Sequence, residues 1–142
     1  MNGQDFLRIT NAAFIPFLTK LGFEVDEPSV SGRYYRVSYT GLSHAVSVSY
    51  EPGDNALFLI VFSRKNGELS DIDDSTRTPR LADLNSRYMS AVTAEERREN
   101  EAFFRFVEAK DEEERMVLKA AKELRLVLPR YLRINGVGSI GP

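Results

Sequence analysis

Hydrophobic residues recur every three or four positions from Asp5 to Leu21, which is the spacing of one face of an amphipathic helix. The residues on that face are Phe6, Thr10, Ala13, Phe14, Phe17, Leu18 and Leu21. Pro16 lies inside the pattern, and because proline lacks an N–H and clashes with the preceding turn, we expect it to kink or split the helix. Gly22 is placed to end the helix. Phe23 and Val25 are then expected to lead toward the core.

The pattern next changes to a period of two, which predicts antiparallel strands. Arg33–Tyr39 and Ala45–Glu51 each carry apolar or aromatic residues on one side and mostly polar residues on the other. Ala56–Arg64 is apolar on both sides, as is typical of a strand that is covered on both faces or central in a sheet. Turn signals separate these strands, and a further turn after the third allows a short fourth strand around Leu69–Ile72.

The rest of the chain is patterned for helices. Thr78 is placed to cap a helix that Pro79 opens, and Thr93 with Glu96 forms the capping-box pattern of another. Apolar spacing then continues to Pro129, and it leaves open whether 93–128 is one bent helix or two. We therefore predict an α+β fold, in which an antiparallel meander of three or four strands is flanked by an N-terminal helix and two or three C-terminal helices. Residues 1–134 are expected to form one domain and 135–142 a flexible tail.

Composition restricts the function classes. The 142 residues carry a net charge of −2, without the strongly basic balance that is usual for a nucleic-acid-binding domain. The absence of cysteine excludes thiol catalysis, disulfide scaffolds and iron–sulfur clusters. The first residues have no basic region followed by an apolar one, so we do not expect them to form a secretory signal, and the longest apolar run, 56–62, is too short for a membrane helix. We expect a cytoplasmic protein without a cofactor and without membrane association.

Two positions could carry catalytic chemistry. Asp71, Asp73 and Asp74 could converge on Mg²⁺ or Ca²⁺, because carboxylate oxygens suit these ions. The alternative is a solvated turn in which aspartate and serine side chains bind their own backbone. His44, the only histidine, is more typical of a hydrogen-bonded structural residue at the rim of the core than of a catalytic base, and a zinc site would need further ligands.

The charge distribution along the C-terminal half is uneven. Residues 93–114 carry a net charge of −5, and residues 117–133 carry +4. The two segments could pair across an antiparallel helix pair, or they could form a bipolar surface for a charged partner. A weaker hypothesis is a nucleic-acid contact through the basic residues of the second segment. These are Lys119, Lys122, Arg125, Arg130 and Arg133.

The polar side of the predicted sheet is the best candidate for a binding surface. Its residues on the first two strands are Tyr34, Arg36, Ser38, Ser47 and Ser49. Tyrosine and arginine are enriched at binding hot spots, so this face could contact a partner if it is open. The alternative is that the C-terminal helices cover it.

The run 17–23, followed by the alternating segments 35–39, 46–51 and 57–61, resembles small uncharacterised bacterial proteins of the toxin-immunity type. The resemblance covers about the first half of the chain, and it implies a non-enzymatic protein that binds and blocks another protein. The leading hypothesis is therefore a protein-binding module. The alternative is a small metal-dependent enzyme that uses Asp71, Asp73 and Asp74.

Overall fold

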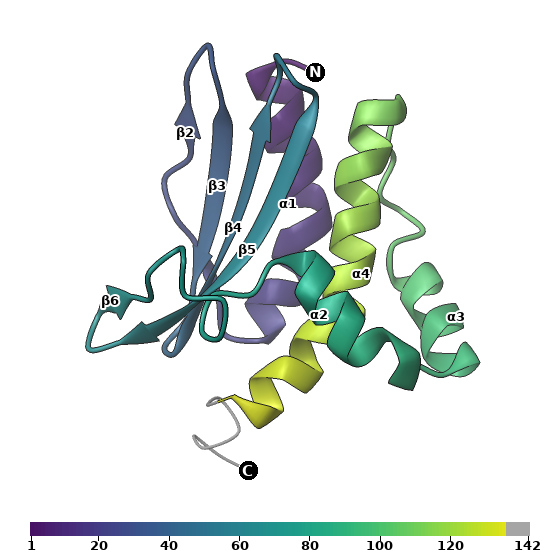
Figure 1. Cartoon of the computed structure of the whole chain (residues 1–142). Coiled ribbons are helices and arrows are strands. Elements are labelled where there is room, and N and C mark those ends of the chain that lie inside the picture. The colour runs from purple at the N-terminus through teal and green to yellow at the C-terminus, as the bar shows by residue number, and fades with distance from the viewer. Residues whose placement is uncertain (136–142) are drawn as a thin grey trace.

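One face of an antiparallel sheet is packed with helices in this protein, as the computed structural model of residues 1–135 shows (Figure 1). The α+β fold predicted from the sequence is confirmed. The elements in chain order are α1 (Gly3–Lys20), β1 (Glu24–Val25), β2 (Ser29–Val30), β3 (Tyr35–Thr40), β4 (His44–Glu51), β5 (Ala56–Lys65), β6 (Glu68–Leu69), α2 (Leu81–Tyr88), a 3-10 turn (Met89–Ala91), α3 (Ala94–Phe103) and α4 (Glu112–Ile134). The flexible tail predicted at 135–142 lies, beyond its first residue, outside the described residues.

The sheet follows the order β1-β3-β4-β5-β6, with β2 also paired to β3, and every pairing is antiparallel. The strand count of six is larger than the predicted three or four. β1 and β2 contain two residues each, which is too short for an alternating pattern to reveal them. β6 is also shorter than the predicted strand at 69–72. It is joined to β5 by an Asn66-Gly67 turn in which both residues have positive φ, as a tight hairpin requires.

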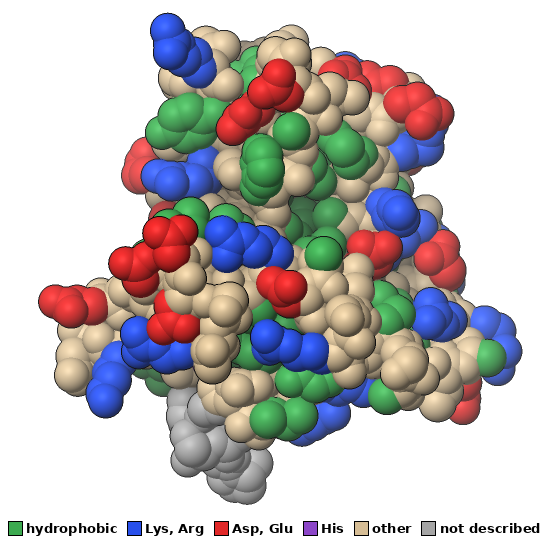
Figure 2. All heavy atoms as spheres, viewed as in Figure 1, with side chains coloured by type: hydrophobic (Ala, Val, Ile, Leu, Met, Phe, Trp, Pro, Cys, Tyr) green, Lys and Arg blue, Asp and Glu red, His purple; other side chains and the backbone are tan. Residues whose placement is uncertain are grey.

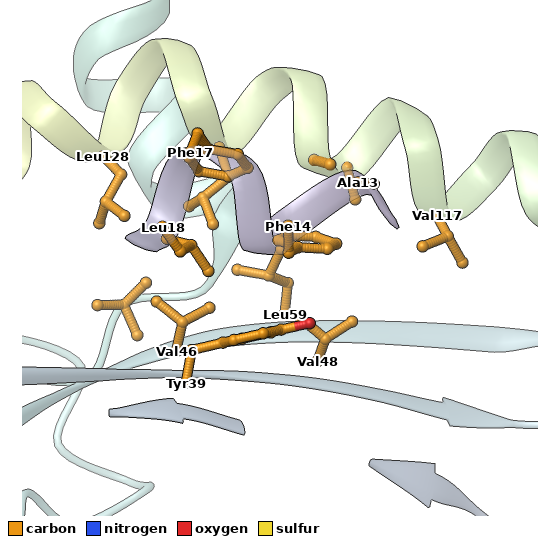
Figure 3. Packing of buried hydrophobic residues seen from close by; sticks show 14 of the residues in the cluster. Ala13, Phe14, Phe17, Leu18, Tyr39, Val46, Val48, Leu59, Val117 and Leu128 are labelled. Atoms are coloured by element: carbon orange, nitrogen blue, oxygen red, sulfur yellow. The ribbon is translucent and has the colours of Figure 1, made fainter. Parts of the chain in front are cut away.

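The hydrophobic core lies between the sheet and the helices α1 and α4. Figure 3 shows Phe14 and Leu18 of α1 pointing toward Tyr39 and Val46 of the sheet. The side chains that the sheet contributes to the core are almost fully buried. They are Val37, Tyr39, Val46, Val48, Tyr50, Leu59 and Val61. Because successive side chains of a strand alternate between the two faces, this burial fixes which residues occupy the opposite face.

Both internal prolines lie within continuous helices, which corrects the expected boundaries. Pro16 is inside α1, so it does not split the helix, and Pro129 is inside α4, which continues to Ile134. Each proline removes one backbone hydrogen bond. Burial of Phe17 and Leu18 after the first proline, and of Tyr131 and Leu132 after the second, favours continuation of the helix.

The structure corrects the expected start of the helix after Pro79 and the expected burial of Val25, and it answers the open question about residues 93–128. The helix after Pro79 begins at Leu81 with Arg80 as its N-cap; the Thr78 hydroxyl is instead buried and donates to the Asp71 carbonyl at 2.6 Å. Residues 93–128 contain two helices, α3 and α4, and the Thr93 capping box is confirmed. Val25 does not enter the core, since 46% of it is exposed.

Candidate functional site

The face of the sheet opposite α1 is covered by none of the helices in residues 1–135, and it is the face turned toward the viewer in Figure 1. The C-terminal helices lie beside β5 rather than over this face. Arg36 is exposed, and Tyr34 is 38% exposed, while Ser38, Ser47 and Ser49 are half-buried. The structure therefore brings the five residues named from the sequence together on one accessible surface, which we call the open face.

The pairing register arranges the open face in three rows that cross β3, β4 and β5, and a fourth pair, Glu51 with Ala56, lies at the end of the β4–β5 hairpin. The rows are Arg36, Ser49 and Phe58; Ser38, Ser47 and Ile60; and Thr40, Ala45 and Phe62. β4 contributes only alanine and serine to these rows, whereas β5 contributes large apolar side chains. The middle row continues to Arg80, which lies opposite Ile60 in an isolated bridge. The open face is thus polar and small at its centre, and apolar along β5.

Phe58 is the most exposed of the apolar residues of β5 on this face, at 43%. Figure 2 shows hydrophobic side chains gathered on this side of the molecule and continuing into a hollow between the sheet and the helices. The corresponding cavity has a volume of about 190 Å³ and is lined by residues of β5, of the start of α2 and of α4. An exposed aromatic ring beside an apolar hollow is a typical feature of interaction sites.

Three arginines, Arg36, Arg64 and Arg80, lie around the apolar residues of β5 on the open face. None of them forms an ion pair within residues 1–135. The Arg36 guanidinium lies 5.9 Å from the centroid of the Tyr34 ring. Arg64 donates to the Gly41 carbonyl at 2.8 Å, and Arg80 donates to the Ile72 and Thr78 carbonyls at 3.0 and 3.1 Å. Because their charges are not neutralised by a carboxylate, they favour an anionic partner.

Part of the edge of β5 is also unpaired. The N–H groups of Val61 and Ser63 donate to the Pro79 and Arg77 carbonyls, so this half of the edge is occupied. By the alternation of a strand, the N–H groups of Leu57 and Leu59 point to the same side. There the described residues offer them no backbone acceptor. Free N–H groups beside an apolar hollow are a template for adding an extended segment.

The acidic loop after β6 is organised by its own backbone. The Asp71 carboxylate accepts from the N–H of Asp73 at 2.8 Å, and the Asp74 carboxylate accepts from the N–H of Thr76 at 3.1 Å. Asp74 also forms an ion pair with Arg77 at 2.9 Å, and hydrogen bonds from Arg77 lower the pKa of this carboxyl. Residues 1–135 contain no group of three or more side chains placed to share a metal ion. The metal-dependent enzyme therefore stays a prediction.

His44 lies at the rim of the core, as its alternation phase predicts. It is 2% exposed, its Nδ1 contacts the Ser43 hydroxyl at 3.0 Å, and its ring packs edge-on against Tyr131 at 5.4 Å. Burial lowers its pKa, which favours the neutral ring. Within residues 1–135, the contacts of His44 are with Ser43 and Tyr131 and not with a carboxylate, which is the arrangement expected of a structural histidine.

The charged helices pair in part across α3 and α4. Arg130 contacts Glu96 at 3.0 Å, and Lys122 contacts Glu101 at 2.9 Å. The acidic start of α4 turns instead to the N-terminal segment, where Glu113 binds the Met1 amino group at 2.7 Å. The paired arrangement expected from the sequence thus accounts for some of these charges.

The residues that the sequence analysis did not assign to the site are Phe58, Ile60, Arg64 and Arg80. For the three residues of β5, the alternation phase places them on the same face as Ser47 and Ser49, and this signal was present in the sequence. Arg80 joins them only through the bridge to Ile60, which no local pattern predicts.

Comparisons with protein-family models, with curated proteins and with solved structures gave no match to this chain. The resemblance to immunity-type proteins therefore stays a prediction. Among the described residues, no helix is both long and apolar enough to cross a membrane.

Proposed function

We propose that this chain is a non-enzymatic protein-binding domain that docks an acidic, extended segment of another protein on the open face of its sheet. The observation that carries the proposal is the exposed Phe58 beside Ile60, with three arginines around them that have no carboxylate partner among residues 1–135. A cytoplasmic location and an immunity-type inhibitory role belong to the same proposal. An inhibitor of that type needs only a surface that covers its target.

The residues of the open face should contribute to binding in different ways. A buried aromatic anchor surrounded by polar residues is the usual composition of a binding hot spot, so Phe58 should contribute most to affinity. Arg36, Arg64 and Arg80 lie at its margins, where charge mainly raises the association rate and selects acidic partners. The serines of β4 lie next to Phe58 and Ile60 in the interior of the sheet, where long side chains of the segment could reach their hydroxyl groups.

An extended segment fits the open face better than a helix does. The unpaired N–H groups of Leu57 and Leu59 can both donate to carbonyl groups of one segment if that segment is in the β conformation. Such a segment would place alternate side chains toward Phe58 and into the hollow beside it. The remaining side chains would face solvent.

The experiment is affinity capture, with photo-crosslinking, from cells that express the chain natively. The variants are Phe58→Ser and Arg36→Glu, and the control is Phe106→Ser, because Phe106 is an 81% exposed aromatic residue between α3 and α4. A protein captured by the native chain and by the control should be lost with both open-face variants. Its affinity, measured with purified protein, should fall as the salt concentration rises.

The proposal would be wrong if the captured partner bound the Phe58 and Arg36 variants as tightly as the native chain. It would also be wrong if the control abolished binding while the open-face variants did not. A partner whose affinity did not change with salt would contradict the role of the arginines.

A further inference from the structure

A second cavity lies on the far side of the fold from the open face, where α1, α3 and α4 meet. Its volume is about 290 Å³. Phe17, Leu126 and Pro129 form part of an apolar wall, and charged residues from all three helices complete the lining. The cavity uses no residue of the open face, so it is independent of the proposed function.

Two cations of this cavity share one aromatic ring. The Arg125 guanidinium lies 3.9 Å from the centroid of the Phe103 ring, and the Lys20 ammonium lies 5.4 Å from it. Neither residue has a carboxylate partner among residues 1–135. Both side chains therefore contact one ring and line one cavity as cations without an ion pair in the described residues.

Arg125 is held in place by a neutral residue. Its Nη1 donates to the Asn100 side-chain carbonyl at 2.8 Å, and Asn100, which is 2% exposed, donates in turn to the Lys122 carbonyl at 3.0 Å. Burial lowers the pKa of Arg125, and the nearby charge of Glu99, which acts in the opposite direction, offsets only part of this desolvation. One edge of the guanidinium is therefore oriented by protein while the rest has no protein acceptor in the described residues.

The other charges of the cavity do not neutralise this pair. Arg130 is engaged with Glu96 through two contacts of 3.0 Å and also donates to the Leu126 carbonyl. Glu99 remains as an acid, and Arg133 remains as a further cation without an ion pair in the described part of the chain. Four cations against two carboxylates leave the lining with a net charge of +2.

We infer that this cavity binds a small organic monocarboxylate, with the carboxylate at Arg125 and Lys20 and its apolar body against Phe17, Leu126 and Pro129. Guanidinium groups match the geometry of a carboxylate by forming two parallel hydrogen bonds. A compact ion such as phosphate is less suitable, because it has no apolar body to lie against the wall formed by Phe17, Leu126 and Pro129. The volume is just below the ~300–1,000 Å³ that is typical of drug-sized ligands, so the ligand is small.

The test is calorimetric titration of the full chain with octanoate, with acetate and 1-octanol as comparison probes. Acetate carries the charge without the tail, and 1-octanol carries the tail without the charge. Octanoate should bind saturably in the millimolar range, and each comparison probe should bind at least tenfold more weakly. Arg125→Gln should weaken octanoate binding at least tenfold, and Lys20→Gln about threefold.

The matched control is Arg115→Gln, which removes an arginine from the same helix at an exposed position where its partner is Glu112. It should leave octanoate binding unchanged. If Arg125→Gln unfolds the chain, the exposed Lys20→Gln variant decides alone. The inference is overturned if octanoate does not saturate, if 1-octanol binds equally well, or if Lys20→Gln and Arg115→Gln have equal effects.

Discussion

Replacing Val48 and replacing Arg36 should have very different effects on the free energy of unfolding, although the two residues lie on adjacent strands. Val48 is fully buried between the sheet and the helices. Its replacement by alanine removes two methyl groups, or ~1.6 kcal/mol of transfer free energy at ~0.8 kcal/mol for each group. An unfilled void of ~40 Å³ would add ~1 kcal/mol at ~24 cal/mol per Å³. We expect a total loss of about 2–3 kcal/mol.

Arg36 points to the open face and has only the distant contact with the Tyr34 ring to lose. An exposed contact of this kind contributes ~0.5 kcal/mol, and surface substitutions usually change stability by no more than about that amount. Arg36→Ala and Tyr34→Ala should therefore each lower the free energy of unfolding by about 0.5 kcal/mol or less.

The assay is urea unfolding, followed by far-UV circular dichroism, with the midpoint and the slope fitted separately. A change in midpoint at constant slope reports a change in stability, whereas a change in slope would indicate a different denatured state. If Arg36→Ala or Tyr34→Ala cost as much as Val48→Ala, both faces of the sheet would be buried and the open face would not exist. If Val48→Ala cost less than 0.5 kcal/mol, the assignment of the core face would be wrong, since a buried valine cannot be removed so cheaply.

Two further substitutions test the interior of the fold. Burial lowers the pKa of His44, so the unfolded chain binds this proton first and stability should fall as the pH drops below about 6.5. His44→Leu should make the urea midpoint depend less on pH between pH 7.5 and 5.5. If the midpoint of this variant depends on pH as strongly as that of the native chain, other groups cause the effect. Arg8→Ala removes the ion-pair partner of the fully buried Glu114 carboxylate. It should lower the urea midpoint more than Arg115→Ala, which breaks an exposed ion pair of the kind that contributes ~0.2–1 kcal/mol. Equal losses would show that Lys110, whose Nζ lies 3.8 Å from the Glu114 carboxylate, replaces Arg8 as its partner.

The alternation of polar and apolar residues was sufficient to predict the meander and to sort β3 and β4 into two faces. It was ambiguous for β5, which is apolar on both sides and was expected either to be covered on both faces or to lie centrally in the sheet. The structure resolves this ambiguity in another way, since Leu59 faces the core at 5% exposure while Phe58 faces solvent at 43%. A buried strand and a strand with an exposed apolar patch have the same pattern, and only the position of the helices distinguishes them.

Features that depend on distant parts of the chain were not accessible to local patterns. The cavity between α1, α3 and α4 joins Lys20 to Phe103 and Arg125, and no spacing rule relates residues so far apart. The N-cap of α2 was misplaced for a similar reason. The Pro79 carbonyl accepts from Val61 of β5, so this segment is held in the sheet before the helix begins.

The net charge of −2 describes neither candidate site. Acidic residues outnumber basic ones in the chain, yet several of them are used inside the fold: Glu114 pairs with Arg8, Glu113 binds the Met1 amino group, and Asp5 pairs with Lys110. The charges left without an ion pair at the open face and in the helical cavity, among residues 1–135, are mainly cations. Local potential, not net charge, selects a partner over the screening length of ~10 Å at 0.1 M salt. Because the two surfaces share no residue, an anion that saturates the cavity should not compete with an acidic segment on the open face.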